Sequence, residues 1–280
     1  MILGDYRIEV IPDAEFRLDG GAMFGVVPRV LWESVCPPDE KNRIRLNLNC
    51  IFIDTGKDKI LIDTGIGGKW SEKETEIYGI GRRKLLSDSL FEVTGCRADE
   101  ITKVVNTHLH FDHAGGNTIR DGGGLRPQFP NAVYLVAKRE LEHAEYPSER
   151  DRASYLPENW EPLLASQQLI TMPDAYEPVE GLQIQTIRGH SATMQTWRLD
   201  RGGQTIYGFA DLIPTRHHLR PAWIAAYDLF PLETLEFKKT ILPQAAAENW
   251  LCLFYHDPEM PLVKIKFDGK SFIASEPADV

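Results

Sequence analysis

The stretch "NTHLHFDHAGG" (residues 106–116) places three of the chain's eight histidines and one aspartate within six consecutive positions. Neutral imidazole and carboxylate groups are good ligands for zinc and related divalent ions. In an extended or looped segment, His108 and His110 can point to the same side and share one ion. Asp112 and His113 can then face a second ion nearby. The pattern therefore predicts a site for two metal ions, each of which takes two ligands from one short segment.

The sequence around this cluster predicts where it lies in the fold. The β-branched run "ITKVVN" (residues 101–106) is typical of a strand and leads directly to the cluster, and Gly115 and Gly116 permit a tight exit. We therefore expect the cluster in a loop at the carboxyl end of a strand. The remaining ligands must come from elsewhere, and three candidates follow predicted strands: His190, Asp211 and His256.

Hydrophobic periodicity predicts strands and helices in both halves of the chain. We expect a β-hairpin from strands at 43–53 and 59–62, and a helix at 83–94 that ends before Gly95. The other strands are expected at 101–106, 131–136, 168–172, 182–187, 193–199, 204–209, 250–255 and 262–267, and the other helices at 138–145, 161–167 and 232–248. This order predicts two sheets packed face to face and covered by helices. No Pro/Ser-rich linker interrupts the sequence, so we expect one domain over residues 1–280.

The composition indicates a globular protein and disfavours nucleic acid as a partner. The formal net charge is −10, and no long run of lysine and arginine is available to bind a phosphate backbone. The N-terminus lacks the features of a signal peptide, and no segment approaches the length of a membrane span, so we expect a cytoplasmic protein without a membrane partner. The four cysteines form no CxxC pair and are expected to be free, reduced and mostly buried.

The order of the candidate ligands resembles that of the metallo-β-lactamase superfamily. The matching pattern is His-x-His-x-Asp-His, followed by a lone histidine in a Gly-His context, an aspartate after a strand and a histidine near the C-terminus. The segment "ILIDTG" (residues 60–65) also matches a usual segment of the family. The resemblance covers nearly the whole chain. It implies an α+β fold, the four-layer αββα sandwich of two similar halves with the metals at one edge.

The resemblance also implies a role for each ligand. One ion is expected to bind His108, His110 and His190. The other is expected to bind Asp112, His113 and His256, and Asp211 is expected to bridge the two ions. Asp63 is expected to orient a ligand. The implied chemistry is hydrolysis by a hydroxide that bridges the two ions, with Asp112 as the proton acceptor. Zinc is the expected metal, with Mn, Fe, Co and Ni as alternatives.

Two further segments, 18–46 and 209–231, resemble the branch that holds quorum-quenching N-acyl-homoserine-lactone lactonases and methyl-parathion-hydrolase-like enzymes. This similarity implies that the protein opens a lactone or a related ester, with phosphotriester hydrolysis as the alternative. Lactonases of this type carry a tyrosine a few residues after the bridging aspartate, whereas this chain has Pro214. Tyr227 or a metal-bound water is then the candidate to assist the leaving alkoxide.

Other functions of the superfamily fit the sequence to different degrees. A nuclease would need a basic surface, which a net charge of −10 disfavours. An oxygen-reducing di-iron protein typically has glutamate in place of His110. A thioesterase of the glyoxalase II type shares the ligand set and remains an alternative. A metal-binding protein without enzymatic activity is expected to have lost some ligands, and this chain retains the full set.

Other residues have two interpretations each. Five side chains are candidates to line the substrate pocket, with ordinary core packing as the alternative for the aromatic ones: Phe24, Trp32, Trp223, Tyr227 and His217. His143 is expected on an exposed helix face, and His217 and His218 in a solvated loop, where one of them is a candidate for the substrate entrance. Residues 18–46 are a candidate active-site cover or homodimer contact, and a small molecule is the expected substrate.

Overall fold

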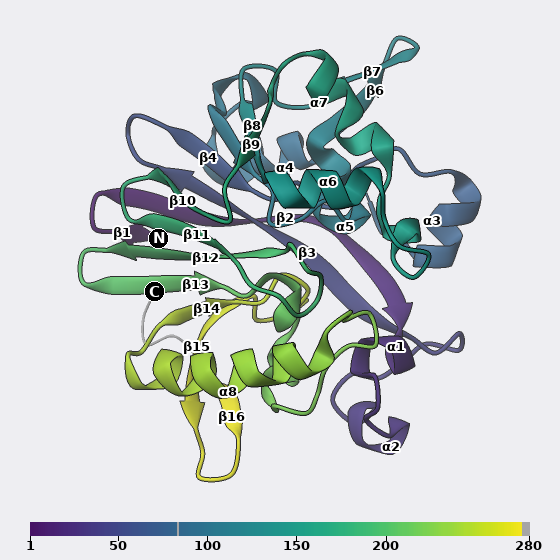
Figure 1. Cartoon of the computed structure of the whole chain (residues 1–280), viewed down its shortest axis with the longest axis vertical. Helices are drawn as coiled ribbons and strands as arrows, with labels where there is room; N and C mark the ends of the chain where they lie inside the picture. The colour runs from purple at the N-terminus through teal and green to yellow at the C-terminus, as the bar shows by residue number, and fades with distance from the viewer. Residues whose placement is uncertain (83, 276–280) are drawn as a thin grey trace. The chain divides into compact units, whose positions relative to one another are not determined.

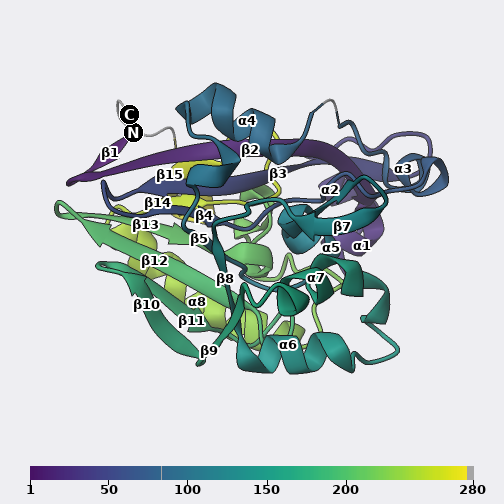
Figure 2. The same ribbon diagram turned by 90° about the horizontal axis from the view of Figure 1, so that it is seen from above.

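The computed structural model describes residues 1–82 and 84–275, and its chain divides into two compact units. The first unit contains Met1–Ala14 and Leu48–Tyr176, and the second contains Glu15–Asn47 and Glu177–Val280. Figure 1 and Figure 2 show that both units combine strands and helices. The predicted mixture of α and β structure is therefore present in each unit.

One seven-stranded sheet has the order β1-β2-β3-β4-β5-β8-β9. Within it, β3 and β4 form the predicted antiparallel hairpin, and β4, β5, β8 and β9 run parallel. Parallel strands are usually covered on both faces, which explains why β4 and β5 are short apolar runs without alternation. The strands are β1 (Ile2–Leu3), β2 (Tyr6–Asp19), β3 (Arg43–Asp54), β4 (Lys59–Ile62), β5 (Lys103–Val105), β8 (Val133–Ala137) and β9 (Leu169–Met172).

The predicted helices of the first unit are present as α4 (Leu86–Thr94), α6 (Lys138–Glu145) and α7 (Glu161–Ala165). The first of them was predicted to begin at Arg83, which lies outside the described residues. Leu86 and Leu90 of α4 are buried in an apolar cluster with Leu61 of β4 and Val104 of β5. On another part of the sheet, α6 contacts β8 and β9 (Figure 2). These contacts fix the parallel strands of the first unit.

The second seven-stranded sheet has the order β10-β11-β12-β13-β14-β15-β16. Because β12 is antiparallel to both β11 and β13, and β13 is parallel to β14, the strands β11, β13 and β14 share one direction. The predicted long helix is α8 (Pro231–Ala247), which packs against β15 (Figure 1). The strands are β10 (Ala175–Val179), β11 (Leu182–Thr186), β12 (Gln195–Arg201), β13 (Gln204–Gly208), β14 (Leu251–Leu253), β15 (Leu262–Phe267) and β16 (Phe272–Ser275).

Several short elements were not predicted, because most of them span only four or five residues, which is too few to show a clear period. The helix α3 has no buried residue and begins with a capping box between Ser71 and Glu74. These elements are α1 (Gly20–Phe24), α2 (Arg29–Trp32), α3 (Glu72–Tyr78), α5 (Phe111–Ala114), β6 (Thr118–Asp121) and β7 (Gly124–Pro127). The strands β10 and β16 were missed as well.

The backbone that follows β4 lies directly against the backbone of the His-rich segment. Thr64 donates its backbone N–H to the carbonyl of His113 at 2.7 Å. A Cβ atom built on Gly115 would lie 2.2 Å from the carbonyl oxygen of Ile66, and one built on Gly67 would lie 2.1 Å from that of Gly115. Real Cβ atoms do not approach a backbone oxygen this closely, so both positions require glycine.

Gly115→Ala is therefore expected to destabilise the protein, by about 1–3 kcal/mol for an overpacked site that forces backbone movement. Urea unfolding, followed by circular dichroism, measures the change in the free energy of unfolding. Gly124→Ala is the matched control, because a Cβ atom there meets nothing within 4 Å. Equal stability of the two variants would contradict the assignment of Gly115 as a close-contact position.

A buried lysine connects α8 to the chain segment that precedes it. Lys238 has none of its surface exposed, and its ammonium donates hydrogen bonds to the carbonyl oxygens of Arg220 at 2.9 Å and Trp223 at 2.8 Å. Burial disfavours the charged form and lowers the pKa of Lys238 from 10.5 to about 7. The folded protein therefore releases this proton at a lower pH than the unfolded chain does.

The free energy of unfolding should consequently rise with pH between about 7 and 10.5, where the unfolded chain holds a proton that the folded protein has lost. The contribution of one such proton is up to about 1.4 kcal/mol per pH unit. Urea unfolding at several pH values compares the wild type with Lys238→Met. The variant should lose this part of the slope, and parallel pH profiles for the two proteins would show that Lys238 does not titrate in this range.

Candidate metal centre

The predicted ligands of the first unit, and Asp63, which was predicted to orient one of them, follow the carboxyl ends of adjacent parallel strands. Asp63 directly follows β4, and His108 follows β5 by three positions. Such strand ends meet at one edge of a sheet, which is a common place for ligand sites. The prediction that the whole cluster is a loop is wrong for its second part. Asp112 and His113 lie on α5, whose first turn closes when the backbone N–H of His113 donates to the carbonyl of His110 at 3.0 Å.

The four side chains of this segment are close together and buried. The ring centroid of His108 lies 4.5 Å from that of His110 and 4.1 Å from that of His113. The donor atoms of Asp112 and His113 lie within 4.8 Å of one another. None of the four residues exposes more than 8% of its surface. Buried imidazole and carboxylate groups at such separations are a donor set suited to divalent cations.

The carboxylate of Asp63 holds the segment that carries this donor set and orients the ring of His113. This carboxylate accepts hydrogen bonds from the backbone N–H and the hydroxyl of Thr107, each at 2.7 Å, and lies 2.9 Å from Nδ1 of His113. The ring of His113 donates from Nδ1, so its Nε2 is the nitrogen left to bind a metal. Burial raises the pKa of Asp63, and the hydrogen bonds from His113 and Thr107 oppose that rise. Asp63 also has a φ of 58°, an uncommon backbone conformation of the kind that clusters at functional sites.

Two other residues that hold the segment were not identified from the sequence. Thr107 donates its hydroxyl to Asp63, and the same oxygen lies 3.1 Å from Nδ1 of His108. Glu140 of α6 is fully buried, and its carboxylate accepts the backbone N–H of Leu109 at 2.7 Å. Only Glu140 could have been recognised from the sequence, because it lies on the apolar side of the predicted helix and an acid is rarely buried without a partner.

The second unit gathers its three predicted ligands in the same way. His190, Asp211 and His256 each follow, within four residues, one of the three strands that share a direction: β11, β13 and β14. Asp211 lies between the two rings, with Oδ1 2.9 Å from Nε2 of His256 and Oδ2 3.4 Å from Nε2 of His190. The preceding residue, Ala210, has a φ of 46°, so the turn that presents Asp211 is strained.

Both rings of this unit are fixed through their other nitrogen. Nδ1 of His190 lies 3.0 Å from the buried carboxylate of Asp228, which also accepts a hydrogen bond from Thr234 at 2.6 Å. Nδ1 of His256 lies 3.1 Å from the backbone carbonyl of Asn47. A carbonyl oxygen only accepts, so His256 carries a hydrogen on Nδ1. Asp228 and Asn47 were not identified from the sequence, because each is far along the chain from the ring that it orients.

The donor chemistry of this unit fits a bound cation. Once Nδ1 donates, Nε2 of a neutral imidazole carries a lone pair, and a carboxylate oxygen carries lone pairs as well. Nε2 of His256 faces one carboxylate oxygen of Asp211, and Nε2 of His190 faces the other, so two acceptor atoms face each other at each contact. A positive charge at each contact resolves the repulsion, and a carboxylate with one imidazole at each oxygen is arranged to serve two cations.

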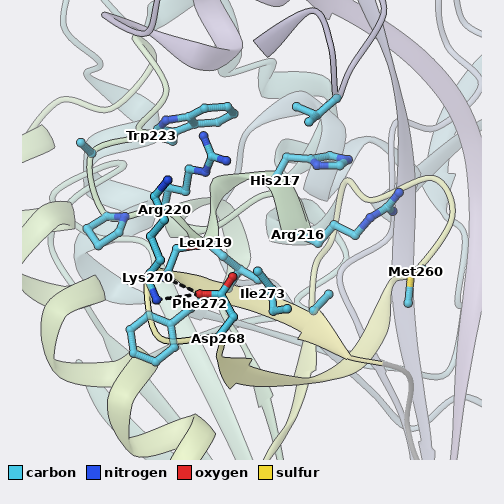
Figure 3. Close-up of a pocket in the computed structure, with 15 residues that line it drawn as sticks. Arg216, His217, Leu219, Arg220, Trp223, Met260, Asp268, Lys270, Phe272 and Ile273 are labelled. Atoms are coloured by element: carbon cyan, nitrogen blue, oxygen red, sulfur yellow. Dashed lines mark hydrogen bonds between the residues drawn. The ribbon is translucent and has the colours of Figure 1, made fainter. Parts of the chain in front are cut away.

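The predicted pocket residues divide into two sets within the second unit. Phe24 and Trp32 are buried, and the Phe24 ring stacks on Trp32 at 5.5 Å and on His218 at 4.6 Å, which is core packing. Trp223 and His217 line a cavity (Figure 3). Burial and the adjacent Arg216 lower the pKa of His217. Tyr227 lies in a loop and exposes 42% of its surface.

The prediction that His218 is a solvated loop residue is wrong. Its ring is fully buried, Nε2 donates to the carbonyl of Met23 at 2.8 Å, and Nδ1 pairs with the hydroxyl of Thr215 at 2.8 Å. Burial lowers the pKa of His218 to about 3, so the ring is neutral and Nδ1 accepts from Thr215. His218 is thus a structural histidine. His143, which was predicted on an exposed face, is half-buried and lies 2.7 Å from a carboxylate oxygen of Asp151.

Three other expectations concern the cysteines, Pro214 and membrane spans. The four cysteines form no disulfide among the described residues, and Cys50, Cys96 and Cys252 are buried, as predicted. Pro214 is buried, and its carbonyl accepts the backbone N–H of His256 at 2.9 Å, so this position supports a ligand through the main chain. Within residues 1–82 and 84–275, no helix has the length and apolar character needed to cross a membrane.

Comparisons with known sequences identify the family of the chain. The family model described as "Metallo-beta-lactamase superfamily" matches residues 43–203. The N-acyl homoserine lactonase of Bacillus cereus is 27% identical over 164 residues, which cover 55% of this chain and 59% of that protein. The N-acyl homoserine lactonase of Bacillus thuringiensis is 26% identical over 162 residues, which cover 55% and 58%. The chain therefore matches less than two thirds of the length of these curated relatives.

Comparisons with solved structures extend over the whole chain. A probable metal-dependent hydrolase from Staphylococcus aureus is 32% identical, with 99% of both chains covered and a TM-score of 0.89. AidC, described as a dizinc quorum-quenching lactonase in complex with a product, is 20% identical, with 100% of this chain and 97% of that chain covered and a TM-score of 0.81. These similarities confirm the expected α+β fold.

Asp63→Asn should weaken metal binding by about 10–100-fold, the usual cost of losing a group that orients a ligand. The amide puts an N–H₂ group where one carboxylate oxygen now accepts, so it faces either the Thr107 or the His113 donors. Competition between the protein and a chromophoric chelator for Zn²⁺ measures the affinity. Asp121→Asn, in an exposed ion pair with Arg126, is the matched control and should bind as the wild type does. An unchanged affinity in Asp63→Asn would remove Asp63 from the metal centre.

Proposed function

The chain belongs to the metallo-beta-lactamase superfamily, and on this basis we propose that it is a metal-dependent hydrolase that opens N-acyl-homoserine lactones or closely related lactones and esters. The observation that carries the lactone assignment is the match to N-acyl homoserine lactonases, which covers 55% of this chain. The donor set of each unit is consistent with it, because hydrolysis of an unactivated ester at neutral pH needs an activated water.

The proposed centre holds two divalent ions. One ion would be held by His108, His110 and His190, and the other by Asp112, His113 and His256, with Asp211 shared between them. The support from the second unit is that Asp211 presents one oxygen to each of two imidazoles. Zinc is the proposed metal, because imidazole and carboxylate ligands suit it and a dizinc lactonase has a similar fold. Mn, Fe, Co and Ni are the alternatives for the same ligands.

The protein's own groups would act mainly by holding the metal-binding imidazole rings in a fixed orientation. Divalent ions at such a centre lower the pKa of water toward neutrality and polarise the carbonyl that is attacked. Asp63, Asp228 and the carbonyl of Asn47 hold three imidazoles in one tautomer, so the ligand nitrogens keep their direction during turnover. In the proposal Asp112, which is itself one of the ligands, also accepts the proton of the attacking water through its carboxylate.

The leaving alkoxide needs a proton from another group, because Pro214 occupies the region where related lactonases carry a tyrosine. We assign this role to Tyr227, whose half-exposed side chain is available to a ligand in solution. Trp223 and His217 are proposed to contact the part of the substrate that does not react. A small molecule is then the substrate class, and the two units are proposed to act as one functional domain.

The assignment is tested with metal-loaded protein and three substrates in parallel: N-hexanoyl-homoserine lactone, a paraoxon-type phosphotriester and S-lactoylglutathione. A pH indicator detects proton release from the lactone and the triester, and loss of thioester absorbance detects the third reaction. We expect the highest kcat/KM for the lactone, and its loss to the background rate in an Asp112→Ala, His113→Ala double variant. Asp174→Ala, which removes an exposed carboxylate, is the control and should keep full activity.

The other outcomes have definite meanings. Turnover of the triester or the thioester alone would replace the lactone assignment with a phosphotriesterase or a glyoxalase II-type thioesterase. Activity that survives in the double variant would refute the metal centre. Tyr227→Phe should reduce kcat for the lactone by roughly 10²-fold or more, as loss of a general acid does, with little change in KM. An unchanged kcat would remove Tyr227 from the mechanism.

A further inference from the structure

The second unit contains a cavity of about 760 Å³, within the range of roughly 300–1,000 Å³ that is typical of small-molecule pockets (Figure 3). It is bordered by η6 (Arg216–Leu219), by the segment that follows η6, and by the turn between β15 and β16. None of the candidate metal ligands is among its lining residues. A ligand in this cavity would therefore be recognised by residues other than those of the metal centre.

One wall of the cavity is apolar and is held in place by buried polar contacts. The wall includes the side chains of Leu219, Trp223, Phe272 and Ile273. The ammonium of Lys238 binds the backbone carbonyls of Arg220 and Trp223, which fixes the part of the wall that Trp223 forms. A wall restrained in this way is formed before a ligand arrives, which lowers the entropic cost of binding.

Two cationic side chains line the same cavity and form no ion pair with the described residues. Arg220 places its guanidinium over the Trp223 ring, 4.6 Å from the ring centroid, and no described residue forms an ion pair with it (Figure 3). The ammonium of Lys270 forms no ion pair within residues 1–82 and 84–275, although its charge acts on Asp268 and helps to lower the pKa of that carboxyl. Arg216 is different, because it is paired with both Asp257 and Glu259. The charge of two exposed cations thus remains available in a chain of net charge −10.

The one acidic side chain in the lining has a structural role. Oδ1 of Asp268 accepts the backbone N–H groups of Lys270 at 2.8 Å and Ser271 at 2.7 Å, which closes the turn between β15 and β16. Hydrogen bonds from Ser271 and Lys270 lower the pKa of Asp268, so it stays ionised. The lining still carries one more positive than negative unpaired side chain, and Arg220 lies at the aromatic end of the apolar wall.

We propose that this cavity binds a medium-chain carboxylate, whose charge is held by Arg220 and Lys270 and whose chain lies along the apolar wall. Charge complementarity selects an anion, and the apolar wall that includes Trp223 and Ile273 selects an apolar tail rather than a small inorganic ion. The cavity includes Trp223 and His217, which are also the proposed substrate contacts, but the carboxylate is held by Arg220 and Lys270, so the proposal holds whichever substrate the metal centre hydrolyses.

Isothermal titration of metal-loaded protein with octanoate tests the proposal, with 1-octanol as the neutral probe of the same length. Octanoate should bind at one site, and an Arg220→Gln, Lys270→Gln double variant should bind it about five- to tenfold more weakly, as expected for the loss of two solvent-exposed charge contacts. Binding of 1-octanol should be the same in both proteins. An Arg126→Gln, Lys138→Gln double variant removes two exposed cations elsewhere and should bind octanoate as the wild type does.

Further variants distinguish this site from binding elsewhere on the protein. Arg220→Lys keeps the charge and should keep most of the affinity, and Ile273→Asp should abolish binding by placing a carboxylate in the wall. Octanoate that binds the double variant and the wild type equally would be bound elsewhere, for instance at the metal ions, and would overturn the proposal. Absence of binding, or equal affinity for 1-octanol and octanoate, would overturn it as well. Thermal unfolding of each variant confirms that the protein is folded in these titrations.

Discussion

A metal-binding imidazole has two nitrogens, and the architecture of both clusters follows from the need to use one of them as a hydrogen-bond donor. His113 is held by Asp63, His190 by Asp228, and His256 by the carbonyl of Asn47. Each of these contacts fixes both the tautomer and the plane of a ring, so Nε2 is directed at the place where a cation would be bound. Without them the rings could rotate, and closeness in space would not produce a metal site.

Supplying these contacts constrains the fold around the clusters. Asp63 and Asp211 each follow a strand that has one parallel neighbour, so each reaches the same edge of its sheet as the histidine that follows that neighbour. Two residues next to the chemistry, Asp63 and Ala210, adopt positive φ values that side chains seldom favour. The surrounding hydrogen bonds hold these conformations, and such local strain is common where function fixes a side chain's position.

Local patterns predicted much of this arrangement. The hairpin of β3 and β4, the helix α6 and the strand β15 have bounds close to the predicted ones, because each shows a period or an apolar run of its own. The ligand candidates could be named from residue type and their positions after strands. Asp228 and Glu140 could not, because each meets its partner across more than 30 residues and nothing in the local sequence marks that contact. His218 was misjudged because the aromatic rings that bury it come from a distant segment.

The contact between Gly67 and Gly115 has an evolutionary consequence. Each glycine is required because the backbone next to the other leaves no space for a methyl group, so a larger residue at either position demands a shift in the opposite segment. Replacing either glycine alone destabilises the protein, so single substitutions cannot change this pair without passing through a destabilised protein. The ligand-bearing segment is therefore protected from drift by two residues that take no part in its chemistry. Variation in this protein should accumulate at positions such as Gly124 of β7, where an added Cβ atom meets no neighbour within 4 Å.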